Sequence, residues 1–426
     1  MSAVPVPREG APLDEWLAFI GAQHPTEIAL GLERVRVVAD RLALGAPPAT
    51  ILVGGTNGKG STCAFLERIL LVAGYRVGLY TSPHLLDYNE RVRVAGVEAS
   101  DTELVDAFAR VQAAREGTPL TYFEFGTLAA LLVFAQRKVE ATVLEVGLGG
   151  RLDAVNIIDA DCAIVTSVDL DHQSWLGDTR EAIGFEKAGI FRARRPAIFG
   201  DLQPPGSLAA HALAIGADLQ VLGRDFRIEV AERQWSFLGR RVSRHALPMP
   251  ALQGAWQLRN AASALAALDE LSEAVPVSLG EVKQGLTSVR LSGRLQVLPG
   301  RPATVLDVAH NPHAARALSD GLLDMGYFEN TFAVFAMLDD KDIGGVIDAM
   351  SGRVDRWFVA SVVSARAAAA SRLMDLLSAR GLGGRAHAFA SVAQALDAAR
   401  REAGANDRIV VFGSFLTVAD ALRTLH

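Results

Sequence analysis

The chain has 426 residues, half of them apolar and 21% charged, with a net charge of −6 at pH 7. Its length predicts two or three domains of ordinary soluble globular composition. The acidic balance excludes a general electrostatic attraction to nucleic acid or anionic membranes, and the longest apolar stretches are too short to span a bilayer. The two cysteines, Cys63 and Cys162, cannot make a disulfide framework or a metal knuckle. We therefore expect a cytoplasmic protein with neither nucleic-acid nor membrane partners.

The first part of the chain alternates helices and strands. We expect helices at residues 13–20, from about 59 to a cap at Gly74, after a capping box at Ser100 and Glu103, and at 125–137. Strands are expected at residues 50–53, 76–80, 142–146 and 162–167. Residues 224–247 alternate polar and apolar side chains over short stretches, which predicts an antiparallel insertion.

A cluster of glycine and proline near residues 292–302 marks a boundary, beyond which the alternation of strand and helix restarts. We expect an ATP-binding domain at 1–293, a linker at 294–302 and a smaller domain at 303–426. The predicted fold class is α/β: a P-loop-type parallel sheet with helices on both faces, followed by a Rossmann-like α/β domain.

The strongest chemical signal follows the first buried strand and opens a helix. It is the run Gly54-Gly55-Thr56-Asn57-Gly58-Lys59-Gly60-Ser61. Glycines let a backbone approach an anion closely, the helix N-terminus adds a favourable dipole, and Lys59 supplies a positive charge. The spacing differs from the usual G-x-x-x-x-G-K-[ST] pattern, so we interpret this segment as a variant phosphate loop.

An ordered set of further motifs accompanies this loop between about residues 13 and 420. They are Thr81-Ser82-Pro83-His84-Leu85, Asn89-Glu90-Arg91-Val92, Thr121-Tyr122-Phe123-Glu124-Phe125-Gly126-Thr127, the run from Leu144 to Ala154, Asp169-Leu170-Asp171-His172, Glu186-Lys187-Ala188-Gly189-Ile190, Arg259-Asn260-Ala261, Ser292-Gly293-Arg294 and Asp307-Val308-Ala309-His310-Asn311-Pro312. With them the chain resembles the folylpolyglutamate synthase family of the Mur ligase superfamily, and in particular its bacterial members that are also dihydrofolate synthases.

The resemblance implies an ATP-dependent ligase that joins L-glutamate to dihydropteroate and to folates through an acyl phosphate. It also implies ATP contacts from Thr56, Asn57, Gly58, Lys59, Gly60 and Ser61. Two magnesium ions are expected, with Ser82 and Glu145 near one and His172 near the other. Glu145 lies at the end of a predicted strand and Ser82 follows the neighbouring one, on the side where α/β sheets bind ligands. Ser61 remains an alternative to Ser82, because ordinary phosphate loops use the hydroxyl after the lysine.

Lys187 lies in a predicted helix and, by position alone, is typical of a solvated surface lysine. The resemblance instead implies a lysine carboxylated by CO₂ that helps to arrange the metal site. That modification requires a neutral amine, hence a pKa depressed by burial. Lys59, Lys187 and His172 are the residues for which we expect catalytic roles.

The resemblance further implies nucleotide contacts beyond the phosphate loop. Asn260 is expected at adenine, Arg294 at phosphate and Asp307 at ribose, with His310 on the same loop. Amides can read base edges, arginines pair with phosphates and carboxylates accept from hydroxyls.

For the pterin acid, the resemblance implies three binding segments: Ala29, Leu30, Gly31 and Leu32; Thr121, Tyr122, Phe123 and Glu124; and Leu152, Asp153 and Ala154. Tyr122 and Phe123 offer flat apolar surfaces. Ala29 departs from the family pattern, which has an aspartate there, and this puts the dihydrofolate synthase activity in question. A folylpolyglutamate synthase alone, a muramyl-type ligase and an ATP-hydrolysing switch remain the competing hypotheses. The family default is a monomer.

Overall fold

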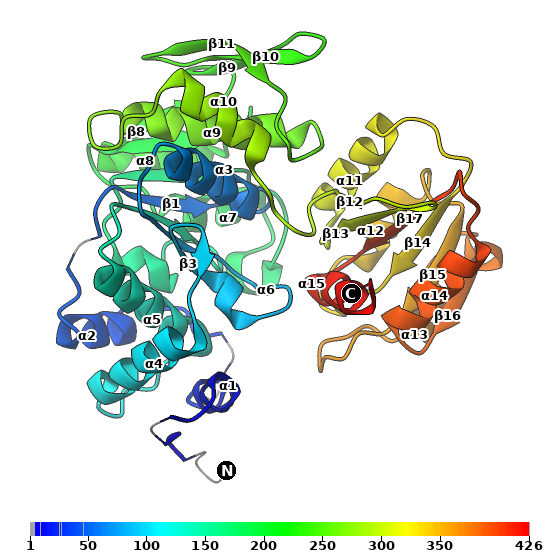
Figure 1. The fold of residues 1–426 in the computed structure, drawn as a ribbon, viewed down its shortest axis with the longest axis horizontal. Coiled ribbons are helices and arrows are strands. Elements are labelled where there is room, and N and C mark those ends of the chain that lie inside the picture. The colour runs from blue at the N-terminus through cyan, green and yellow to red at the C-terminus, as the bar shows by residue number, and fades with distance from the viewer. Residues whose placement is uncertain (1–4, 9, 25, 27, 46, 426) are drawn as a thin grey trace. The chain divides into compact units, whose positions relative to one another are not determined.

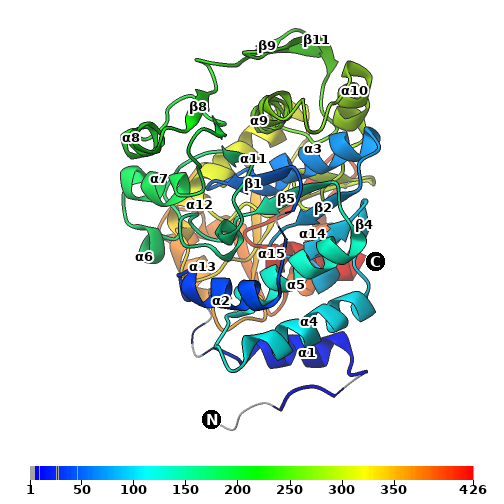
Figure 2. The ribbon, with the colours of Figure 1, turned by 90° about the vertical axis from the view of Figure 1, so that its left-hand side faces the viewer.

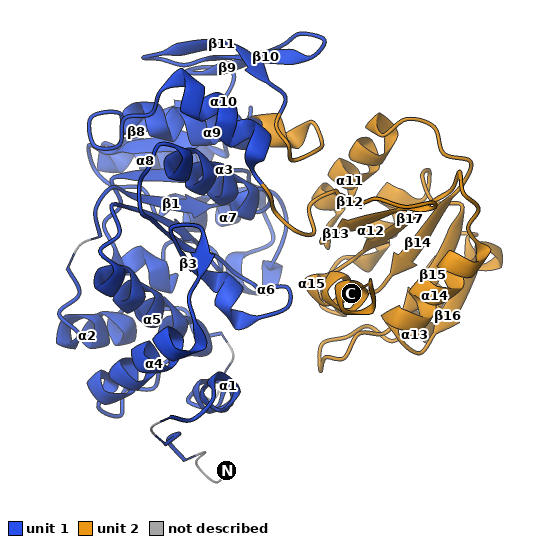
Figure 3. Ribbon diagram, viewed as in Figure 1, with its two compact units in different colours: residues 1–249, 259–289 blue, residues 250–258, 290–426 orange. Residues whose placement is uncertain are grey.

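The computed structural model describes residues 5–8, 10–24, 26, 28–45 and 47–425. The chain forms two compact units, residues 1–249 with 259–289 and residues 250–258 with 290–426 (Figure 3). Each carries its own parallel-rich sheet, and the predicted α/β class is confirmed. None of the helices in the described part is both long and apolar enough to cross a bilayer.

Unit 1 is built on an eight-stranded sheet of order β4-β3-β2-β5-β1-β6-β7-β8, drawn in Figure 1. Its strands are β1 (Thr50–Gly54), β2 (Val77–Tyr80), β3 (Val92–Val94), β4 (Val97–Glu98), β5 (Ala141–Glu145), β6 (Cys162–Val165), β7 (Pro196–Phe199) and β8 (Asp218–Val221). The pairs β2–β3 and β3–β4 are antiparallel, and the other pairs are parallel. β1 is buried along its whole length, which explains its unbroken apolar run.

Helices cover both faces of this sheet. They are α1 (Leu13–Gly21), α2 (Glu33–Arg41), α3 (Lys59–Val72), α4 (Asp101–Arg115), α5 (Tyr122–Arg137), α6 (Gln173–Leu176), α7 (Arg180–Ala188), α8 (Gly206–Ile215), α9 (Trp256–Glu270) and α10 (Leu279–Ser288), with the 3₁₀ helices η1 (Tyr88–Arg91) and η2 (Ala154–Ile157). α3 packs with α10 on one face, and α4 with α5 on the other, where α1 and α2 join them (Figure 2). The predicted capping box at Ser100 and Glu103 begins α4.

A separate antiparallel sheet completes unit 1 and confirms the predicted insertion. It consists of β9 (Arg227–Val230), β10 (Gln234–Leu238) and β11 (Ser243–Pro248). Two ion pairs tie it to α9: a buried one between Arg244 and Asp269, and one at 2.9 Å between the exposed Arg241 and the buried side chain of Glu270.

Unit 2 has a six-stranded sheet of order β12-β13-β17-β14-β15-β16, in which only the β12–β13 pair is antiparallel. The strands are β12 (Gln296–Leu298), β13 (Ala303–Asp307), β14 (Thr331–Phe335), β15 (Arg356–Ala360), β16 (Ala386–Phe389) and β17 (Arg408–Phe412). The helices are α11 (Pro312–Asp324), α12 (Ile343–Met350), α13 (Ala370–Ser378), α14 (Val392–Glu402) and α15 (Phe415–Leu425), with η3 (Gly383–Arg385). The segment expected as a linker thus carries β12.

Candidate active site

The phosphate loop connects the end of β1 to the first turn of α3. Gly58 precedes the helix with φ of +89°, and a methyl group added there would collide with the Asn260 side-chain amide. Gly55 has φ of +141°, and its added methyl would collide with the Thr166 hydroxyl. Glycine is therefore required at both positions by conformation and by close approach.

Hydrogen bonds connect the phosphate loop to the segment after β6. The Thr56 N–H donates to the Ser167 carbonyl at 2.8 Å, and the Asn57 N–H donates to the Ser167 hydroxyl at 3.1 Å. The Thr166 hydroxyl donates to the Asn57 carbonyl at 2.6 Å. Because Thr56 and Asn57 use their N–H groups internally, the donors that α3 offers to an anion are those of its first turn, which helices leave without intrahelical acceptors. The sequence analysis missed Thr166 and Ser167.

Two lysines meet at the carbonyl of Gly55. Lys59 Nζ donates to it at 3.0 Å and to the Thr56 carbonyl at 3.3 Å. Lys187 Nζ donates to the same Gly55 oxygen at 3.0 Å. Lys187 is only 4% exposed, so its interpretation as a surface lysine was wrong. It lies near the end of α7.

Burial, and secondarily the charge of Lys59, lower the pKa of Lys187 to about 7. A neutral amine is thus accessible near neutral pH, which is the condition for carboxylation. Asp153 shows the opposite shift: burial raises the pKa of its carboxyl to about 7, although the N–H groups of Leu148 and Val155 donate to it.

Two predicted metal ligands lie together at the ends of neighbouring strands β2 and β5. The Ser82 N–H donates to Glu145 Oε2 at 2.9 Å, and Glu145 is 5% exposed. A buried carboxylate beside a hydroxyl and a phosphate loop fits magnesium, which binds a few protein oxygens plus phosphates and water. Within the described residues, no group of three His, Cys, Asp or Glu side chains forms a metal cluster.

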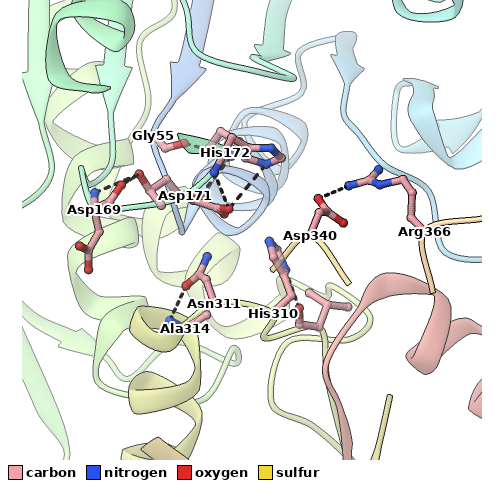
Figure 4. Close-up of polar contacts among 12 residues, drawn as sticks. Gly55, Asp169, Asp171, His172, His310, Asn311, Ala314, Asp340 and Arg366 are labelled. Atoms are coloured by element: carbon pink, nitrogen blue, oxygen red, sulfur yellow. Dashed lines mark hydrogen bonds and ion pairs between the residues drawn. The ribbon is translucent and has the colours of Figure 1, made fainter. Parts of the chain in front are cut away.

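His172 lies in the loop after β6, just before α6. It adopts φ of +52°, and its N–H donates to Asp171 Oδ1 at 2.8 Å. Its Nε2 lies 4.0 Å from the same oxygen (Figure 4). Asp169, two residues before Asp171, donates its N–H to the Thr56 hydroxyl at 3.0 Å. The loop of His172 is therefore fastened to the phosphate loop.

The segments predicted for the pterin acid are connected to one another. The Gly31 N–H donates to the Leu152 carbonyl at 3.3 Å. Arg34 donates to the Ala29 carbonyl at 2.8 Å and to Glu124 at 2.9 Å. Arg34, which was not among the predicted binding residues, thus ties the first segment to the second.

Thr121 and Glu124, predicted as binding residues, also have a structural role. They form a capping box at the N-terminus of α5: the Glu124 N–H donates to the Thr121 hydroxyl, and the Thr121 N–H donates to Glu124 at 2.8 Å. Tyr122 and Phe123 between them remain half-buried. The Phe123 ring packs closely over Gly147 and lies 5.8 Å from the Tyr80 ring. The Phe123 ring thus lies beside the loop after β5, while the Tyr122 ring lies 5.8 Å from that of Tyr88.

In unit 2, Asp307 ends β13 and accepts from the N–H groups of Leu295 and Ala309, both at 2.8 Å. Burial raises the pKa of Asp307, while the neighbouring Arg294 opposes that rise. The Arg294 guanidinium lies 5.1 Å from the Phe415 ring centre. His310 Nδ1 lies 2.9 Å from the Val308 carbonyl oxygen. These three predicted nucleotide residues thus share one end of the unit 2 sheet.

The comparisons with known proteins agree with this geometry. Residues 53–199 match the Mur ligase middle domain, and residues 293–415 match the Mur ligase glutamate ligase domain. The Escherichia coli dihydrofolate synthase/folylpolyglutamate synthase is 44% identical over 420 residues, covering 98% of this chain and 97% of that protein. This chain belongs to the dihydrofolate synthase/folylpolyglutamate synthase family.

Solved structures of this family superpose over nearly the whole chain. An Escherichia coli enzyme in complex with DHPP and ADP has a TM-score of 0.93 and 44% identity, covering 99% of each chain. A bifunctional synthase with Mn, AMPPNP and L-glutamate bound has a TM-score of 0.92, covering 99% of this chain and 100% of that one. The Mycobacterium tuberculosis folylpolyglutamate synthase has a TM-score of 0.84 at 29% identity, covering 93% and 95%.

Membership of the synthase family confirms the predicted resemblance and the predicted enzyme class, a ligase. The roles of individual residues and the domain boundaries stay predictions.

Proposed function

We propose that the chain catalyses ATP-dependent amide bond formation between L-glutamate and the carboxylate of dihydropteroate or of a folate. A single arrangement carries the proposal: a glycine loop with Lys59 at the end of β1, beside the Ser82 and Glu145 pair at the adjacent strands. Relatives of this family bind adenine nucleotides, manganese and L-glutamate in their structures.

A carboxylate does not react with an amine at neutral pH, so it must first be activated. In the proposed reaction, a carboxylate oxygen attacks the γ-phosphorus of ATP and the bond to ADP breaks. The glutamate amine then attacks the acyl carbon, loses a proton and expels phosphate. Lys59 and the first-turn N–H groups of α3 would hold phosphate oxygens, which is the main catalytic requirement of phosphoryl transfer.

Ser82, Glu145 and His172 would hold magnesium, whose charge neutralises phosphate oxygens when it is bound. The near-neutral pKa of Lys187 supports its proposed carboxylation. Asn260, Arg294, Asp307 and His310 are the proposed nucleotide contacts outside the loop.

An ADP-release assay tests the function directly. Dihydropteroate and tetrahydrofolate are each supplied with ATP and magnesium, with and without L-glutamate. The proposal requires ADP only when an acid and glutamate are both present. ATP hydrolysis without either substrate would support the switch hypothesis. Glutamate-dependent activity with tetrahydrofolate but not with dihydropteroate would restrict the enzyme to folylpolyglutamate synthesis. The alanine at position 29 raised this alternative.

We also propose that the enzyme is a cytoplasmic monomer acting on small molecules alone. Sedimentation of the purified chain tests the monomer, and fractionation of cells tests the location.

A further inference from the structure

Arg91 is a half-buried arginine without a carboxylate partner. It ends η1, and its Nε donates to His84 Nδ1 at 2.8 Å. Its guanidinium carbon lies 5.3 Å from the Tyr88 ring centre and 5.5 Å from that of Tyr122. Among the described residues, no Asp or Glu side chain lies within ion-pair distance of it.

Three other arginines of unit 1 pair with carboxylates, whereas Arg68 and Arg115, like Arg91, bond to neutral acceptors. Arg34 pairs with Glu124, Arg93 with Glu67 and Arg151 with Glu186, at 2.9, 3.2 and 2.8 Å. Lys59 of the phosphate loop and Lys187 of α7 both bond to the Gly55 carbonyl. Arg91 is therefore a positioned cation whose terminal nitrogens are left for an anion from outside the chain.

The backbone around Arg91 is fixed. The Glu90 carboxylate accepts from the N–H groups of Leu85 and Leu86 at 2.7 and 2.6 Å. The Arg91 carbonyl accepts from the Thr81 N–H at 3.0 Å. Arg91 is thereby tied to the loop that bears Ser82, while its side chain contacts Tyr122. It lies between a predicted metal ligand and the predicted ring-binding segment.

Building on the proposed function, we infer that Arg91 binds the non-reacting carboxylate of the glutamyl residue already attached to a folate. Dihydropteroate has one carboxylate, which reacts. A folate has a second, which stays charged throughout the reaction and needs a permanent cation. Arginine supplies one, with two terminal nitrogens that fit a carboxylate in a bidentate manner. When dihydropteroate is bound instead, the two tyrosine rings and His84 still stabilise the guanidinium.

The variant Arg91→Gln, assayed with both acids, tests this specificity role. We expect the KM for tetrahydrofolate to rise roughly 10- to 100-fold, the scale of one charge-assisted hydrogen-bonded contact. The kcat/KM for dihydropteroate should stay within about threefold, because its only carboxylate is the reacting one. Arg91→Lys, which keeps the charge, should recover part of the tetrahydrofolate affinity. Arg137→Gln is the matched control, because it removes an exposed arginine from α5, the helix that begins at Tyr122. It should change neither the KM for tetrahydrofolate nor the kcat/KM for dihydropteroate.

A second measurement uses the wild-type chain and a tetrahydrofolate whose non-reacting carboxylate is an amide. The wild type should bind it roughly 10- to 100-fold more weakly, and Arg91→Gln should show no further loss. Equal losses with both acids, or no loss with either, would overturn the inference. If Arg91→Gln does not fold, the amide analogue decides: unchanged affinity in the wild type overturns the role of Arg91. A wild-type chain inactive with both acids would instead overturn the proposed function, and this inference with it.

Discussion

Lys59 and Lys187 donate to one carbonyl oxygen, that of Gly55, each at 3.0 Å. Lys59 belongs to the first turn of α3, whereas Lys187 is buried near the end of α7. Burial and the charge of Lys59 lower the pKa of Lys187 to about 7. We therefore propose different tasks for the two amines: a cation for phosphate from Lys59, and from Lys187 an amine that loses its proton near neutrality.

Replacing Lys59 by alanine should slow turnover at least ~10²-fold, because a charge that stabilises the transferred phosphoryl is lost. The KM for the acid substrates should change little, since the role proposed for Lys59 is at the phosphate and not at the acid. Steady-state ADP release at saturating substrates measures this. Near-normal turnover in Lys59→Ala would remove Lys59 from the mechanism.

Lys187→Met should stabilise the fold while abolishing activity. With a lowered folded-state pKa, the cost of burying a charged lysine is full below pH 7 and declines as pH rises towards the unfolded-state pKa near 10. The Tm advantage of Lys187→Met should therefore be greatest at pH 6 and shrink by pH 9. Lys138→Met removes an exposed lysine and should give a constant difference. A pH-independent advantage for Lys187→Met would contradict the depressed pKa.

Ser82→Ala should raise the magnesium concentration needed for half-maximal turnover by roughly 10-fold, as expected when a metal ligand or its support is lost. Ser61→Ala, in the first turn of α3, should leave it nearly unchanged. Magnesium titrations of both variants compare the two hydroxyls. If only Ser61→Ala raises the requirement, Ser61 is the metal hydroxyl and the assignment of Ser82 is wrong.

Gly58→Ala and Gly74→Ala form a matched pair, because both glycines have left-handed φ, +89° and +91°. Each change should strain the backbone by about 1–2 kcal/mol. A methyl group on Gly74 meets nothing within 4 Å, whereas one on Gly58 collides with Asn260. We expect both to lower the free energy of unfolding, but only Gly58→Ala to reduce turnover by more than about 10-fold. Equal activities would show that the close approach of Asn260 is unimportant.

The parts of the fold that were predicted well are those whose signal is local. The strand expected at residues 50–53 is observed at Thr50–Gly54, because its central residues form an apolar run that is buried in a parallel sheet. The phosphate loop was equally well predicted, since a run of spaced glycines between a buried strand and a helix has few other structural interpretations. Helix α2 was missed: Leu32 caps it without a side-chain bond, and only Val35 and Val38 are buried.

The parts of the site that could not be predicted depend on contacts distant in sequence. Lys187 is buried against Gly55, 132 positions away, and its neighbours in sequence give no sign of this. Thr166 and Ser167 bond to Asn57 of the loop from 109 and 110 positions away. Arg34 meets Glu124 from 90 positions away. The capping box at Thr121 and Glu124 follows a local sequence pattern and could have been predicted, but the segment was interpreted only as a ligand-binding motif.

The most direct test of the account follows one oxygen atom. Tetrahydrofolate or dihydropteroate labelled with ¹⁸O in the reacting carboxylate is turned over with ATP and L-glutamate, and the released phosphate is examined by mass spectrometry. If the acid takes the γ-phosphoryl before the amine attacks, each phosphate carries one labelled oxygen for every amide formed. Amide formation with unlabelled phosphate would contradict activation of the acid by ATP.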